Sequence, residues 1–207
     1  MNVIEKFDRL ARGYAAHDYA DPAVYAARRA QVATALGPAL PAGASVLDLA
    51  CGDANMAEPL LALGLRYRGV DGSAAMIAEA RARLGGRAEL EVGLLEEYEP
   101  PEPVEMTLCL RAAYYAADRG AFFRRVAGYT RVKFVFDFRP VVHDTASVVA
   151  DLRAAGFGGI ELRPFLLPQS RRLPRAALPL VSALEQTGPV ASLVTRRYGR
   201  LFCAAAV

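Results

Sequence analysis

Apolar runs of strand length alternate with segments of helical periodicity from about residue 24 onward. This alternation is typical of a parallel β-sheet with helices on both faces, because parallel strands are joined by crossover helices. We therefore predict an α/β, doubly wound and mostly parallel sheet of seven strands. The expected strands are 45–50, 67–71, 88–93, 106–110, 133–138, 159–165 and 198–206, and the expected helices are 24–36, 55–63, 74–84, 119–129 and 145–155.

The C-terminal part departs from this alternation. Two strand-like runs, 159–165 and 198–206, are separated by residues 168–197, which contain prolines, arginines and a helical stretch. We predict that the two runs form an antiparallel closing pair and that 168–197 is an insertion before the last strand. Residues 1–40 are expected to form an N-terminal helical lid, and the whole chain, 1–207, to form one domain.

The insertion has two features of a binding surface. Apolar residues at helical spacing predict one apolar helix face, formed by Ala177, Leu180, Val181 and Leu184. Three arginines precede or open this helix, where the helix dipole disfavours cations: Arg171, Arg172 and Arg175. The segment is a candidate lid over an apolar or anionic acceptor, or a site of peripheral membrane contact. An ordinary packed helix with solvated arginines is the alternative.

Composition argues against several classes of protein for this chain. No apolar stretch approaches the roughly 20 residues of a membrane span, and the N-terminus lacks a signal-peptide core, so we expect a soluble, cytoplasmic protein. The three cysteines are widely separated, which predicts neither disulfides nor a zinc site. Acidic residues in 89–105 lack metal-ligand spacing, so no metal is predicted. The net charge is only +3 and basic residues are not interleaved with aromatics, which argues against a nucleic-acid partner.

The stretch "VLDLACGDAN" joins a buried strand to a helix expected to begin at Asn55, with Glu58 completing a capping box. Gly52 has no Cβ, so a ligand can approach the backbone closely there. Asp71 ends the next strand, 19 residues beyond Gly52, which is about the spacing at which a carboxylate meets ribose hydroxyls. The three-glycine fingerprint is incomplete and Asp53 would repel a pyrophosphate, so the junction favours a nucleoside without phosphates.

Three quoted stretches resemble motifs of the class I S-adenosylmethionine-dependent methyltransferases. "VLDLACGDA" resembles their first motif, "YRGVDGSAAMIAEAR" their second, and "MTLCLRAAYYAADRGAFFRRV" the strand and helix beside the acceptor. "FDRLARGYAAHDY" is similar to their common N-terminal helix. The resemblance implies a Rossmann-like fold, S-adenosylmethionine as cofactor with S-adenosylhomocysteine as product, and methyl transfer to a small-molecule acceptor. The alternatives are a non-methylating reaction such as cyclisation at the same site, a dinucleotide-dependent oxidoreductase, or a non-catalytic binding module.

By this resemblance, Asp48, Ala50 and Gly52 line the methionine and ribose part of the cofactor, and Asp71 holds the ribose diol. The complete implied set is Tyr14, Asp48, Ala50, Gly52, Asp71, Gly72, Ser73, Met76, Leu94, Leu95 and Leu110. Ala54 replaces a family glycine and is expected to narrow the site. After the third strand, Gly93 is followed by leucines, so adenine contact there would be made by the backbone or by Glu96. "LRAAYY" lacks the Asn/Asp-Pro-Pro-Tyr signature of enzymes that methylate nucleobase amines or glutamine.

Three residues are candidates for the catalytic step. His143 and His17 are the only histidines, and histidine is the side chain best suited to act as a base near neutral pH. The alternative for each histidine is a solvated residue without a catalytic role. Arg111 follows the strand 106–110 at the expected ligand edge of the sheet. It either orients a carboxylate of the acceptor or cofactor, or is one surface charge in an arginine-rich chain.

Overall fold

The computed structural model describes residues 2–187 and 199–207. Within them, a seven-stranded sheet has the order β3-β2-β1-β4-β5-β7-β6. The strands are β1 Ser45–Leu49, β2 Arg66–Asp71, β3 Glu89–Val92, β4 Val104–Cys109, β5 Thr130–Phe138, β6 Ile160–Phe165 and β7 Arg200–Ala206. Strands β1 to β5 are parallel, whereas β7 runs antiparallel to both β5 and β6. The predicted fold class and antiparallel closing strand are confirmed.

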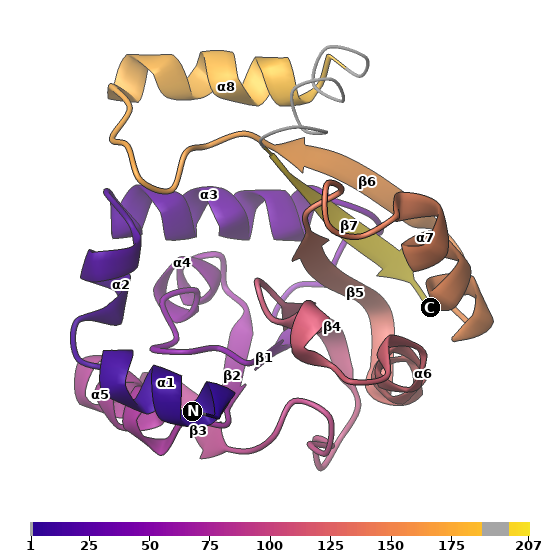
Figure 1. The fold of residues 1–207 in the computed structure, drawn as a ribbon, viewed down its shortest axis with the longest axis horizontal. Helices are drawn as coiled ribbons and strands as arrows, with labels where there is room; N and C mark the ends of the chain where they lie inside the picture. Colours follow the sequence, from indigo (N-terminus) through magenta and orange to yellow (C-terminus); the bar gives the residue numbers. More distant parts are fainter. Residues whose placement is uncertain (1, 188–198) are drawn as a thin grey trace.

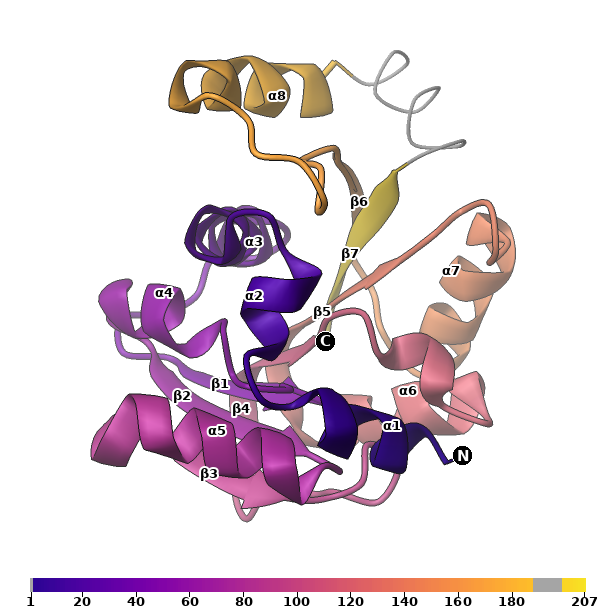
Figure 2. The ribbon, with the colours of Figure 1, turned by 60° about the vertical axis from the view of Figure 1, so that its left-hand side comes forward.

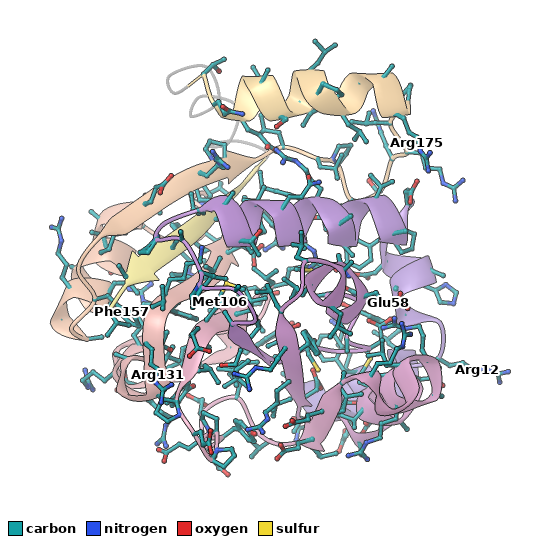
Figure 3. All side chains as sticks on the ribbon, turned by 180° about the vertical axis from the view of Figure 1, so that it is seen from behind. Arg12, Glu58, Met106, Arg131, Phe157 and Arg175 are labelled. Carbon is teal, nitrogen blue, oxygen red and sulfur yellow. The ribbon has the colours of Figure 1, made fainter. Side chains whose placement is uncertain are left out.

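Helices cover both faces of this sheet (Figures 1 and 2). They are α1 Val3–Leu10, α2 Tyr14–Asp18, α3 Pro22–Ala35, α4 Ala57–Ala62, α5 Ala74–Leu84, α6 Arg119–Tyr129, α7 Thr145–Ala154 and α8 Leu178–Glu185. Alternate residues of each strand face opposite sides, so the sheet divides the core in two. Val46 belongs to the core on the side of α3, α4 and α5, whereas Leu47 belongs to the core on the side of α6 and α7. Met106 lies in the interior, while Arg12 and Arg175 extend outward (Figure 3).

Side-chain caps explain why two helices have the predicted bounds. Ser73 accepts from the backbone N–H of Met76 at the start of α5, and Asp118 accepts from that of Ala121 at the start of α6. The cap predicted at Asn55 is wrong, because α4 begins at Ala57 and has no side-chain cap. The Asn55 amide instead accepts a tertiary hydrogen bond from Arg29 of α3 and donates a local one to Asp53.

The N-terminal helix implied by the resemblance is interrupted. Gly13, with φ of +72°, separates α1 from α2 in a conformation that favours glycine. A capping box formed by Asn2 and Glu5 begins α1. The hydroxyl of Ser73 donates to Asp8 of α1 across 2.5 Å, and this bond ties α1 to the start of α5. α1 therefore lies over the ends of β1 and β2.

The helix of the insertion, α8, lies beside α3 (Figure 1), and polar side chains join the two helices. Arg28 of α3 forms an ion pair with the buried Glu185 of α8 and donates to Ser182 across 2.9 Å. These contacts orient α8 and leave two residues of its predicted apolar face open to solvent: Leu180 is 72% exposed and Leu184 is 36% exposed. Residues 188–197 of the predicted insertion, and Tyr198 of the predicted last strand, lie outside the described residues.

No helix within residues 2–187 and 199–207 is long and apolar enough to cross a membrane.

Candidate functional site

A cavity of about 310 Å³ lies at the carboxyl ends of β1, β2 and β4, with α1 along one wall. Ligand sites of open α/β sheets form at this edge. All eleven predicted cofactor residues line it: Tyr14, Asp48, Ala50, Gly52, Asp71, Gly72, Ser73, Met76, Leu94, Leu95 and Leu110. Sequence reasoning did not identify the contribution of α1, whose Val3, Ile4 and Phe7 also line the cavity.

Asp71 organises the loops at the carboxyl ends of β1 and β2. Its two carboxylate oxygens accept the backbone N–H groups of Gly52 at 2.7 Å and Ser73 at 2.8 Å. Burial raises the pKa of Asp71, and these two hydrogen bonds act against that rise. Each carboxylate oxygen can accept more than one hydrogen bond, so Asp71 retains acceptor capacity toward the cavity. This arrangement suits a ligand with neighbouring hydroxyl groups.

Backbone strain concentrates around the cavity. The non-glycine residues with positive φ in the described chain are Ala50 at 54°, Ala54 at 54° and Arg111 at 61°. Such conformations cost about 1–2 kcal/mol each for residues with a Cβ. All three lie in the turns after β1 and β4. The expectation that Ala54 narrows the site is wrong, because its methyl group is fully buried in the core and does not line the cavity.

Asp48 is buried where β1 meets the cavity. The Tyr67 hydroxyl donates to it across 2.7 Å. Burial raises the pKa of Asp48 to about 7, although the Tyr67 hydrogen bond and the Arg29 charge both act to lower it. The cavity therefore contains a carboxyl group that changes charge near neutral pH, and a cationic ligand would favour its ionised form.

Arg29 of α3 is the strongest site feature that sequence reasoning missed. It is 5% exposed, lines the cavity, and lies within 5.3 Å of the Tyr19 and Tyr25 ring centroids. Its Nη2 donates to Asn55, but among the described residues its Nε has no partner and no carboxylate forms an ion pair with it. A buried cation without a counterion is costly, so the position fits a ligand carboxylate. With 23 arginines in the chain, nothing in the sequence distinguished this one.

Of the three candidate catalytic residues, only Arg111 lines this cavity. Its Nη1 donates to Asp18 and to the Tyr19 hydroxyl, both at 2.6 Å. Asp18 also accepts from Tyr14 and from Gln169, so one carboxylate joins α2, the turn after β4 and the segment after β6. The guanidinium is therefore half-buried and already ion-paired.

The two histidines lie elsewhere. His17 is on an exposed part of α2 and does not line the cavity. His143 follows β5 and lines a second, smaller hollow beside Tyr114. Burial, with a smaller contribution from the Arg119 charge, lowers the pKa of His143. Its imidazole is therefore predominantly neutral at neutral pH.

Comparison with known proteins adds independent findings. Residues 46–132 match a family model described as a methyltransferase domain. Over 88 residues the chain is 34% identical to the ubiquinone biosynthesis O-methyltransferase of Bradyrhizobium sp. (strain ORS 278), a match covering 41% of this chain and 35% of that protein. The corresponding Rhodopseudomonas palustris (strain TIE-1) protein is 32% identical over 89 residues, with the same coverage. The chain thus spans about a third of the length of these curated relatives.

Solved structures match over nearly the whole chain. The complex of the Haloferax volcanii Trm112 methyltransferase activator with a putative methyltransferase gives a TM-score of 0.70 at 22% identity, covering 99% of this chain and 97% of that one. The fold is that of a Rossmann-like methyltransferase. With the match of residues 46–132 to the methyltransferase-domain model, it agrees with the resemblance of the sequence motifs to the class I S-adenosylmethionine-dependent methyltransferases. The predicted family is confirmed.

Proposed function

We propose that this chain transfers a methyl group from S-adenosylmethionine to a small-molecule acceptor. The observation that carries the proposal is one cavity that joins a glycine turn, the Asp71 carboxylate and the guanidinium of Arg29, which has no carboxylate partner among the described residues. These groups match parts of the cofactor: Asp71 matches the ribose diol, Arg29 matches the carboxylate of the amino acid, and the glycine turn lies where the ribose and the methionine meet. A magnesium protoporphyrin IX methyltransferase from Synechocystis has been solved with bound S-adenosylmethionine, and its structure gives a TM-score of 0.58.

The cavity residues fit this cofactor chemically. Asp71 accepts the ribose hydroxyls, Arg29 holds the methionine carboxylate, and Asp48 faces the cationic end. The apolar side chains that border the adenine are Ile4, Met76, Leu94 and Leu95. When bound, S-adenosylmethionine supplies an electrophilic methyl group on a positively charged sulfur.

The chain itself contributes alignment and exclusion of water. α1 covers the cavity and is held to α5 by the bond between Ser73 and Asp8. Arg111 and Asp18 keep α2 against the turn after β4, where the acceptor would approach. Gln169 donates to Asp18 and Arg172 donates to the Ala20 carbonyl, so the segment after β6 is linked to the same wall. We propose that the N-terminal helices and the described part of the insertion, 168–187, act as lids over the acceptor.

The acceptor class rests on two observations. The turn after β4 lacks the Asn/Asp-Pro-Pro-Tyr signature, which disfavours nucleobase amines and glutamine. The curated relatives are named as O-methyltransferases of ubiquinone biosynthesis, which supports a small molecule and favours an oxygen acceptor.

An acceptor screen tests the proposal. Purified protein is incubated with S-adenosylmethionine and a panel of small hydroxylated and amino compounds, and both products are detected by mass spectrometry. We expect S-adenosylhomocysteine to form together with a product 14 mass units heavier than its acceptor. A product that forms at this site without gaining a methyl group would support the cyclisation alternative and overturn the proposal.

A further inference from the structure

We propose that the second hollow binds an aromatic ring of the methyl acceptor that carries a hydroxyl or amino group. This inference rests on the proposed function. The hollow measures about 190 Å³ and lies between the turn after β4, the end of β5 and the first turns of α6 and α7. Among the residues that the structure describes, none lines both this hollow and the main cavity. It is therefore a separate compartment at the same edge of the sheet.

The size of the hollow limits its ligand. A dry protein cavity of about 150 Å³ is large enough to hold benzene. A hollow of about 190 Å³ therefore holds one substituted ring, and is too small for a nucleoside joined to an amino acid. The cofactor and this ring would occupy different compartments.

The lining favours a flat, apolar ring. Phe123, Phe136 and Phe138 are buried and form its apolar floor. The rings of Tyr114 and His143 stack beside it, with centroids 6.2 Å apart and planes inclined by 23°. Tyr114 is 40% exposed, so the hollow opens to solvent on that side. Aromatic walls bind aromatic rings through offset-stacked and edge-to-face contacts.

One turn separates this hollow from the main cavity. Arg111, Ala112 and Tyr115 line the main cavity, whereas Ala113 and Tyr114 line the hollow. The rings of Tyr114 and Tyr115 pack together with centroids 4.6 Å apart. The turn after β4 therefore forms a common wall, and a substituent on a ring in the hollow can extend around it toward the cofactor.

His143 is the polar group best placed to bind a substituent of the ring. Arg119 is engaged with Asp151 and Ser147, and Asp137 accepts from Arg111 and Arg200. By contrast, in the part of the chain that the structure describes, the His143 imidazole has no hydrogen-bond partner. A neutral imidazole has one nitrogen that accepts a hydrogen bond. A hydroxyl or amino group on the ring can donate to it.

Phenol is the probe for this site. Because the chain has two histidines, His143→Gln assigns both imidazole C–H resonances in a proton NMR spectrum. Phenol is titrated into protein saturated with S-adenosylhomocysteine. We expect a saturable shift of the His143 resonance and no shift of His17, which lies on exposed α2. A shift of neither resonance, or an equal drift of both, overturns the inference.

Two variants with a matched control locate the probe. Ala116→Phe fills the hollow from its partly buried wall, whereas Ala121→Phe adds the same ring at an exposed position of α6. Only Ala116→Phe should abolish the His143 shift. If that variant does not fold, Tyr114→Ala replaces it, and we expect phenol affinity to fall by about threefold or more through loss of stacking.

Three further outcomes bear on the inference. Phenol affinity unchanged in folded Ala116→Phe, or in Tyr114→Ala, overturns it. Cyclohexanol binding as tightly as phenol overturns the aromatic assignment. Failure of S-adenosylhomocysteine itself to bind is measured separately by calorimetry and contradicts the proposed function, so the two failures are distinguishable.

Discussion

Arg29 donates from Nη2 to Asn55 Oδ1 across 2.6 Å, and within the described residues its Nε remains buried without a partner at the cavity wall. The bond removes Asn55 from its predicted role as a helix cap and orients the guanidinium. The neighbouring Tyr19 and Tyr25 rings stabilise its charge through cation–π contacts but provide no anion. We therefore expect an anionic group of the ligand to bind at Arg29.

Arg29→Met should weaken S-adenosylhomocysteine binding by about 10- to 100-fold, the effect of losing a charged hydrogen-bond partner worth about 1.5–3 kcal/mol. The neighbouring Arg28 is the matched control, because it pairs with Glu185 and does not line the cavity. Arg28→Met should lower the melting temperature and leave affinity unchanged. Equal affinities of the two variants in calorimetry would remove Arg29 from the site.

Substitutions of Asp71 should separate loop structure from ligand binding. Asp71→Ala removes the acceptor of two backbone N–H groups, so we expect both a lower melting temperature and an affinity loss of about 1.5–3 kcal/mol. Asp71→Asn retains one acceptor oxygen and should recover part of the stability while binding stays weak. Full affinity in folded Asp71→Ala would show that the ribose is not bound there.

Two glycines test whether the turn after β1 is a ligand contact. Gly52 and Gly43 both have positive φ, at 59° and 69°. A Cβ at Gly43 would meet nothing within 4 Å, whereas Gly52 lines the cavity and its Cβ would lie 3.9 Å from the Tyr14 ring. Valine at either position should destabilise the protein, but only Gly52→Val should abolish cofactor binding. Similar affinities for the two variants would place the ligand elsewhere.

The raised pKa of Asp48 predicts opposite effects of pH on the stability of the protein and on cofactor binding. Its pKa is about 7 in the folded protein against an ordinary value of 3.8, so between these values the folded state binds more protons than the unfolded state. The stability of the ligand-free protein should therefore fall from about pH 4 to pH 7. S-Adenosylmethionine is cationic at its methionine end, so its affinity should rise as Asp48 ionises.

Asp48→Asn is the variant that tests this assignment. It should flatten both pH profiles, as measured by urea denaturation and by calorimetry from pH 5 to pH 8. Profiles in the variant that retain the wild-type slopes would assign the titration to another group.

The sequence predicts elements whose signals are local. α5 and α6 have the expected bounds because Ser73 and Asp118 cap them within their own turns. The eleven residues implied by the resemblance gather at one cavity because the carboxyl ends of neighbouring parallel strands meet at one edge.

Features that depend on tertiary contacts cannot be predicted from local sequence signals. Asn55 bonds to Arg29 instead of capping α4, and Glu185 of α8 pairs with Arg28 of α3. The chain has 23 arginines, so the sequence did not indicate that Arg28 and Arg29 in particular make these contacts. The sequence predicted an N-terminal helix but not the cavity contacts of Val3, Ile4 and Phe7, because α1 buries none of its residues and so has no core signal that marks its inner face.

Isothermal titration calorimetry of the wild-type chain shows whether the cavity binds the proposed cofactor. S-Adenosylhomocysteine and NAD⁺ are titrated separately into the same preparation. We predict one S-adenosylhomocysteine site per chain, with micromolar or tighter affinity, and no measurable binding of NAD⁺. Absence of S-adenosylhomocysteine binding by folded protein, or a preference for NAD⁺, would contradict this prediction.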